Sequence, residues 1–146
     1  MPQTTTRTSA LAPGRDPVRL RKGLLICGVV AGPVYVLVSV TQALTREGFD
    51  LTRHAWSLLT NGDLGWIQIT NLIVSGLLVI AGGARLGRTL GTNNGWAPGL
   101  LSGYGLNMVA AGIFPADPAL GFPPGTPQQT TTSWQGTVHF VAAGRT

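Results

Sequence analysis

The sequence predicts an all-α fold, a polytopic transmembrane helix bundle whose amino terminus lies in the cytoplasm. The first observation is three stretches without a charged residue, of 22, 21 and 28 residues, over 23–44, 64–84 and 89–116. Roughly 20 apolar residues in a helix cross the hydrocarbon core of a bilayer, whereas a helix of a soluble domain needs a polar face. The second observation is that charged residues make up only 10% of the chain, against roughly 25% in soluble domains.

Residues 1–19 are expected to form a disordered basic tail on the cytoplasmic side, because they combine Thr, Ser, Pro, Gly and Arg with little apolar content. The first helix follows over about 20–44, with Pro33 near its middle, where membrane bundles accommodate a kink. Its apolar stretch is longer than the roughly 7–15 residues of a signal peptide, so we interpret it as a retained helix. Cys27 is the only cysteine, which excludes an intramolecular disulfide.

The remaining elements follow from the other apolar stretches. We expect the second helix over about 64–84 and the third over about 96–114, before a loop at 115–133 that holds five prolines. The last apolar segment, 136–144, reaches about 14 Å as a helix, less than half of the roughly 30 Å hydrocarbon core. The prediction is therefore three full helices plus the start of a fourth, in a bundle domain over 20–146 that is truncated relative to a longer protein.

Lysine and arginine residues set the predicted orientation, because the cytoplasmic side of a membrane protein carries an excess of them. With the amino terminus inside, seven lie on the cytoplasmic side and two, Arg46 and Arg53, lie outside. The loops 45–63 and 115–133 then face outward from the plasma membrane. The net charge of +5 is accompanied by no nucleic-acid motif or basic-aromatic patch. We expect the lipid bilayer as partner and no nucleic acid, while a homo-oligomer or another membrane subunit stays open.

Small residues indicate where the helices pack. Gly99 and Gly103 belong to a stripe of four-residue steps along the third helix that also contains Asn107, and Gly28 and Gly32 repeat the pattern on the first. In lipid, helices associate where small residues let their backbones approach. We therefore expect these four glycines at helix contacts.

Polar residues within the apolar stretches have two interpretations. Gln68, Asn71 and Asn107 either form interhelical hydrogen bonds or line a polar conduit. No acidic residue lies deep within any stretch, which argues against proton-coupled or ion-coupled transport.

Residues capable of acid-base chemistry gather in the outward loops and at the start of the fourth segment. Two histidines with carboxylates can transfer protons or ligate a divalent metal. The alternative is that the loop charges are simply solvated and that His139 makes an interfacial hydrogen bond. No HExxH-type spacing is present, so we assign no metal and no other cofactor. The candidate catalytic residues are Asp50, His54, Asp117 and His139, and the candidate binding residues are Arg53, Ser57, Gln68, Asn71 and Asn107.

The chain resembles the bacterial and archaeal membrane family called domain of unknown function 998 in the stretches FDLTRHAWSLL (49–59), NGDLGWIQ (61–68) with Asn71, AGIFPADP (111–118) and GTVH (136–139). The resemblance covers about 23–144. It implies a bundle of about six helices, of which this chain would lack roughly the last two and most of the fourth. It also implies that one outward-facing site contains Asp50, Arg53, His54, Ser57, Asp117 and His139. It supplies no reaction.

Three functions fit these observations. The first, which we favour, is a multi-pass membrane protein whose outward-facing polar site has a binding or structural role. The second is a membrane-embedded enzyme that acts on a lipid or its headgroup, with or without a metal. The third is a small-solute transporter, for which a charged residue deep within a helix would be the expected sign.

Overall fold

Helices account for all the regular structure in the part of the chain that the structure describes. The computed structural model describes residues 17–90, 95–128, 131–142 and 144. Its elements, in order, are α1 (Pro17–Thr45), the short 3-10 helix η1 (Trp56–Thr60), α2 (Gly65–Leu90), α3 (Trp96–Ile113) and α4 (Trp134–Ala142). Among these residues the only β pairing is an isolated bridge between Ala119 and Phe122. The predicted all-α class is confirmed.

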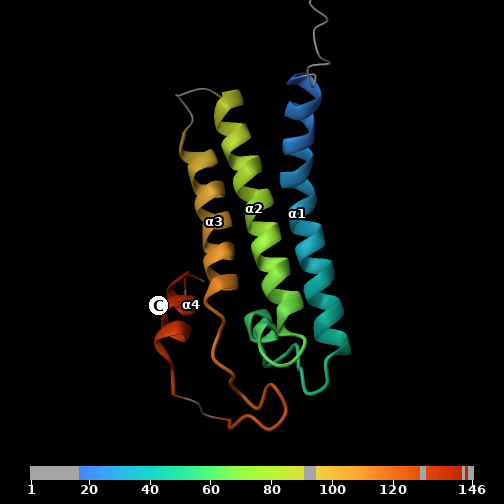
Figure 1. Cartoon of the computed structure of the whole chain (residues 1–146), viewed down its shortest axis with the longest axis vertical. Coiled ribbons are helices and arrows are strands. Elements are labelled where there is room, and N and C mark those ends of the chain that lie inside the picture. Colours follow the sequence, from blue (N-terminus) through green and yellow to red (C-terminus); the bar gives the residue numbers. More distant parts are fainter. Residues whose placement is uncertain (1–16, 91–94, 129–130, 143, 145–146) are drawn as a thin grey trace, which may run out of the picture.

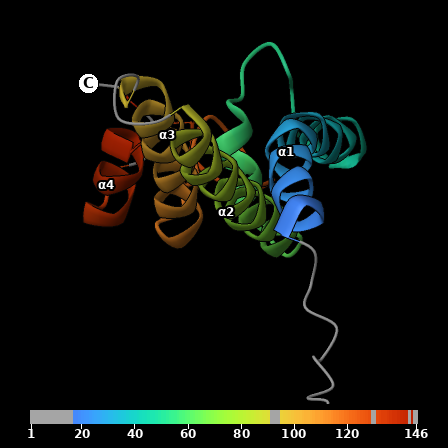
Figure 2. The ribbon, with the colours of Figure 1, turned by 90° about the horizontal axis from the view of Figure 1, so that it is seen from above.

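The three long helices run side by side, and α2 lies between α1 and α3 (Figures 1 and 2). The chain reverses direction at each connection, so neighbouring helices are antiparallel. The η1 helix, α4 and the segment that follows α3 lie together at the end of the bundle where α1 finishes and α2 begins. The two loops that the sequence predicts to share a surface therefore do lie at one end.

The helix boundaries differ from the predicted ones in two places. Helix α1 begins at Pro17 and not at residue 20, and the earlier part of the predicted tail lies outside the described residues. Helix α2 continues to Leu90, beyond the predicted end at 84. The charges of Arg85 and Arg88 end the apolar stretch but not the helix, because arginine is a good helix former.

Two helices are long and apolar enough to cross a membrane, α1 over Gly28–Thr45 and α2 over Gly65–Leu90. Helix α3 has 18 residues, which extend about 27 Å. It is not one of the two helices that qualify as membrane spans. A third crossing by α3 therefore stays a prediction.

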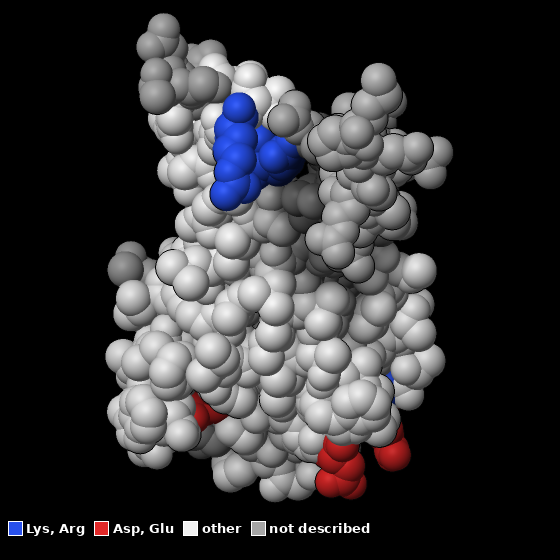
Figure 3. Space-filling view, turned by 45° about the horizontal axis from the view of Figure 1, so that its top comes forward, with Lys and Arg blue, Asp and Glu red and all other residues white. Residues whose placement is uncertain are grey.

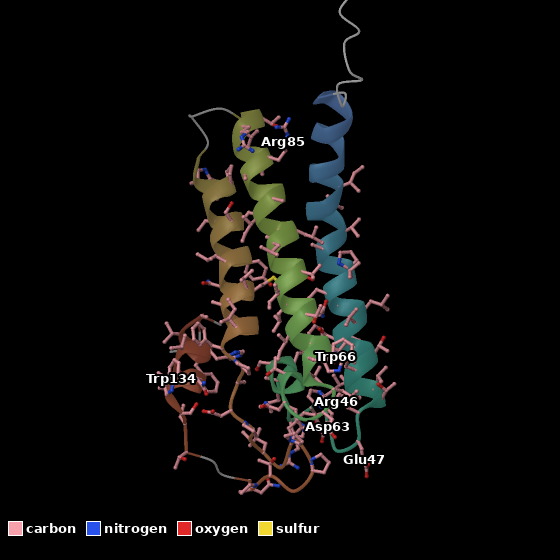
Figure 4. All side chains as sticks on the ribbon, in the orientation of Figure 1. Arg46, Glu47, Asp63, Trp66, Arg85 and Trp134 are labelled. Carbon is pink, nitrogen blue, oxygen red and sulfur yellow. The ribbon has the colours of Figure 1, made fainter. Side chains whose placement is uncertain are left out.

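The surface between the two ends of the bundle is apolar. Leu37 of α1 and Leu106 of α3 are 68% and 62% exposed. In Figure 3 the acidic residues lie near one end and the main basic group near the other, with uncharged surface between them. Exposed Trp66 and Trp134 lie at the acidic end (Figure 4), while exposed Trp96 begins α3 at the opposite end. Tryptophans at both edges of an apolar belt are typical of membrane proteins, so this surface indicates a membrane location.

Glycine-to-glycine contact brings α2 and α3 together. A Cβ placed on Gly76 would lie 2.6 Å from the carbonyl oxygen of Gly105, and a Cβ on Gly105 would lie 2.6 Å from that of Gly76. Further along, a Cβ on Gly83 would lie 2.5 Å from Ser102 Oγ, and one on Gly112 would lie 2.8 Å from Ile73 Cγ1. These positions have room for a hydrogen atom only.

The predicted contacts of Gly32, Gly99 and Gly103 are not found, because nothing lies within 4 Å of a Cβ placed on any of them. Steps of four residues rotate by about 40° each around a helix, so such a stripe turns away from a straight partner. Steps of seven rotate by only about 20°. Residues Gly105 and Gly112, seven apart, accordingly stay on the face toward α2.

Helices α1 and α2 contact each other through a pair of glycines and through a set of polar side chains. A Cβ on Gly28 would lie 3.2 Å from the Cα of Gly82. Closer to η1, Ser39 and Gln68 are completely buried, and Gln68 Nε2 donates to Ser39 Oγ at 3.1 Å. Asn71 Nδ2 donates to the carbonyl oxygen of Tyr35 at 3.1 Å. Gln68 and Asn71 thus make interhelical hydrogen bonds, the first of their two interpretations.

Arg46 fastens the loop after α1 to the end of η1 and to the residue that follows η1. Its Nη1 donates to the carbonyl oxygen of Leu59 at 2.6 Å, its Nη2 donates to that of Asn61, and its guanidinium lies 5.0 Å from the centre of the Phe122 ring. Burial lowers the pKa of Arg46, and the Asp63 carboxylate acts in the opposite direction. Phe122, which is 1% exposed, is thereby held in a small apolar core beneath the helices.

Candidate functional site

His54 connects two loop segments at the end of the bundle where α1 finishes and α2 begins, which is here called the base of the bundle. Its Nδ1 accepts a hydrogen bond from the backbone N–H of Asp50 at 2.9 Å, so its Nε2 carries the proton and donates to the carbonyl oxygen of Leu120 at 3.1 Å. The ring is buried and packs against Phe49 and Phe122, with centroid distances of 5.2 and 5.7 Å. Both nitrogens are occupied, so His54 does not offer a lone pair for catalysis or for a metal.

Asp50 is engaged within its own turn. Its Oδ1 accepts hydrogen bonds from the hydroxyl of Thr52 at 2.6 Å and from the backbone N–H of Thr52 at 2.8 Å. These bonds, the hydroxyl first, hold the pKa of Asp50 below its ordinary value. The carboxylate shapes the 50–54 turn, and its hydrogen bonds lead to no other predicted site residue.

Asp117 anchors the beginning of α4. Its two oxygens accept hydrogen bonds from the backbone N–H and the hydroxyl of Ser133, both at 2.6 Å. Ser133 Oγ in turn accepts the backbone N–H of Gly136 at 3.0 Å, which is the geometry of a helix N-cap. The carboxylate also lies so close to Gly136 that any Cβ there would overlap it. A negative charge beside the first turn of α4 is favoured by the helix dipole.

His139 joins α4 to the end of α3. Its side chain is 1% exposed, and its Nδ1 lies 2.7 Å from the carbonyl oxygen of Phe114 and 3.2 Å from that of Ala111. Two carbonyl neighbours require a proton on Nδ1, because a carbonyl oxygen can only accept. These carbonyls lie in the last turn and at the C-cap of α3, where no helical N–H is available to them.

The predicted site residues line two neighbouring hollows and not one. A hollow of about 330 Å³ at the base of the bundle, here called the surface pocket, is lined by Arg53, His54, Ser57 and Asp117 among others. A second hollow of about 450 Å³, here called the bundle cavity, lies among the helices. Its described lining is polar at Tyr35, Ser57, Tyr104, Asn107 and His139, and otherwise consists of Leu72, Met108, Ala111, Ala142 and Gly144. Ser57 lines both hollows, whereas Asp50 is not among the lining residues of either.

The family of the chain follows from comparison with known proteins. A family profile described as Protein of unknown function (DUF998) matches residues 29–146. The chain belongs to this family. The predicted resemblance is thus confirmed, and the match includes every lining residue of both hollows. Comparisons with curated proteins and with solved structures gave no match.

The described part of this DUF998 protein brings no three His, Cys, Asp or Glu side chains together in a way that could hold a metal ion. Among the described residues, no side-chain hydrogen bond joins two of the four candidate catalytic residues. The Asp50 and Asp117 carboxylates accept from Thr52 and Ser133, while the His54 and His139 rings bond to Leu120 and to the end of α3. Asp50 meets the His54 ring only through its backbone N–H. A single site that contains all four residues, which would bring at least one pair of their side chains within hydrogen-bond or metal-ligand reach, therefore stays a prediction.

Two aromatic residues of the bundle cavity escaped the sequence analysis. Tyr35 and Tyr104 are the only tyrosines of the chain, and both lie within apolar stretches on different helices. A phenol inside such a stretch was a usable signal, because its hydroxyl needs a polar partner in lipid. Met108 and Ala142 carried no signal, since they resemble any other apolar residue of a helix.

Proposed function

We propose that this DUF998 protein is a multi-pass protein of the plasma membrane that binds a small amphipathic molecule in the bundle cavity. The observation that carries the proposal is the composition of the cavity wall. A volume of about 450 Å³ falls within the roughly 300–1,000 Å³ usual for ligand sites. Apolar residues such as Leu72 and Met108 alternate there with a few converging polar groups, as in most small-molecule sites.

The position of the cavity opening supports a ligand that enters from the membrane. Tyr104, which lines the cavity, is 58% exposed, and Asn107 beside it on α3 is also exposed. Both lie on a helix whose outward surface is apolar. The open side therefore adjoins lipid in this arrangement, and an acyl chain can remain in the bilayer while a polar head enters the cavity.

The orientation completes the proposal. The seven-to-two distribution of basic residues supports a cytoplasmic amino terminus, with α3 as a third crossing. The end that carries η1 and α4 then faces outward, and the bundle cavity opens in the outer half of the bilayer. The lipid-directed enzyme and the solute transporter remain hypotheses without a specific observation in their favour. A conduit that joins Gln68, Asn71 and Asn107 is also less favoured, because only Asn107 lines the cavity.

The test is to fill the cavity from α4. Ala142 lines the cavity, whereas its neighbour Val141 is 67% exposed. We expect Ala142→Trp to remove the amphipathic molecules that copurify with the protein in mild detergent, since an indole occupies the space that they need. Val141→Trp should retain them. Native mass spectrometry counts the bound molecules and also reports whether the protein is a homo-oligomer or carries another subunit. Wild-type protein without any bound amphiphile, or equal retention in both variants, would contradict the proposal.

A further inference from the structure

The described lining of the bundle cavity contains polar groups but no acidic, lysine or arginine side chain. These polar groups are hydroxyl, amide and imidazole groups. Arg53, which could pair with an anion, lines the surface pocket and donates to Gln128 Oε1 at 3.1 Å. An anionic head in the bundle cavity would lose its hydration without gaining a cation there, which is costly.

His139 offers this cavity a hydrogen-bond acceptor in a fixed direction. Its Nδ1–H is directed at the carbonyl oxygens of Phe114 and Ala111, which leaves the lone pair on Nε2. Nε2 makes no hydrogen bond within the described part of the chain. The ring is almost completely buried, and the hollow that His139 lines is the bundle cavity. Nε2 is thus the ring nitrogen that is left for a ligand in this cavity.

We infer that the bundle cavity recognises the uncharged hydroxyl head of a neutral lipid alcohol, of which diacylglycerol is a simple example. The hydroxyl of the lipid donates to His139 Nε2, and its oxygen can accept from the Asn107 amide or a tyrosine hydroxyl of the lining. This inference rests on the proposed function and specifies its ligand. It makes His139 a binding residue whose role does not require Asp50, His54 or Asp117.

The test compares two lipids that differ only in the head. Dioleoylglycerol presents a hydroxyl where dioleoyl phosphatidic acid presents a phosphate. Both can be titrated into the 146-residue chain in detergent, with native mass spectrometry as the measurement. We expect wild-type protein to bind dioleoylglycerol about tenfold more tightly, the range of one hydrogen bond plus an avoided desolvation. His139→Asn keeps an N–H donor for the carbonyls of α3 but has no acceptor at the position of Nε2. It should bind dioleoylglycerol several-fold more weakly than the wild type, which reduces the preference.

The outcomes separate the inference from the proposed function. Equal or tighter binding of phosphatidic acid by the wild type overturns the inference, while amphiphile binding in the cavity stands. Unchanged binding of dioleoylglycerol by a folded His139→Asn variant overturns the role of Nε2. Absence of binding of either lipid, together with no effect of Ala142→Trp on copurified amphiphile, removes the proposed function itself. The wild-type preference needs no variant, so a misfolded His139→Asn protein leaves the first comparison decisive.

Discussion

Gly136→Ala is expected to detach α4 from the bundle and to lower the melting temperature of the purified protein by several degrees. The added methyl group would overlap the Asp117 carboxylate, whose oxygens are both held by Ser133. Such overpacking costs on the order of 1–3 kcal/mol. A fluorescence or circular-dichroism melt in detergent measures the effect, and Gln135→Ala, an exposed change one position earlier, should leave the transition within about 0.5 kcal/mol of the wild type.

A double variant identifies the cause of this loss. Asp117→Ala alone should cost on the order of 1–3 kcal/mol, because it removes the carboxylate that accepts from the backbone N–H and the hydroxyl of Ser133. Combined with Asp117→Ala, the substitution Gly136→Ala no longer meets the carboxylate, so the double variant should be no less stable than Asp117→Ala. Strictly additive losses would show that Gly136 and Asp117 do not interact.

Gly76→Ala is expected to push α2 and α3 apart. Its Cβ would lie 2.6 Å from the carbonyl oxygen of Gly105, a backbone atom that can retreat only if α3 moves. We expect a loss of on the order of 2–3 kcal/mol in the free energy of unfolding, measured by thermal or denaturant unfolding in detergent. Gly103→Ala is the matched control in the same bundle, because its Cβ would meet open space and alanine is the better helix former.

The two glycines decide between two descriptions of the packing. If the four-residue stripe of α3 formed the contact, Gly103→Ala would be the more damaging change. A larger loss for Gly103→Ala than for Gly76→Ala would therefore contradict the α2–α3 interface described above.

The elements of the fold were predictable because a bilayer imposes a simple rule on sequence. Long stretches without charge fix the existence and order of α1, α2 and α3. The end of α2 was not predictable from the same rule. The rule locates the edge of the apolar layer, whereas a helix ends where its backbone hydrogen bonds end. The packing face of α3 was also missed, because four-residue and seven-residue glycine steps coexist in that helix and only the partner's position selects between them.

The candidate site was predictable in its location and not in its contacts. Topology alone brings His54 and Asp117 to one end of the bundle. Whether a loop histidine is free or clamped depends on a carbonyl 66 positions away, that of Leu120, and no periodic pattern encodes such a pair. The GTVH stretch gains a physical explanation from the structure: Gly136 makes room for Asp117, and His139 closes the end of α3.

We propose that η1, α4 and the bundle cavity lie toward the outside of the cell. Single cysteines at Glu47 and Gln128, both exposed at that end, and at Thr89, exposed at the far end of α2, test it in a Cys27→Ser background. A membrane-impermeant maleimide applied to intact cells should label Glu47→Cys and Gln128→Cys, and should reach Thr89→Cys only after lysis. Labelling of Thr89→Cys in intact cells, with the other two protected, would contradict the orientation and the outward-facing site that depends on it.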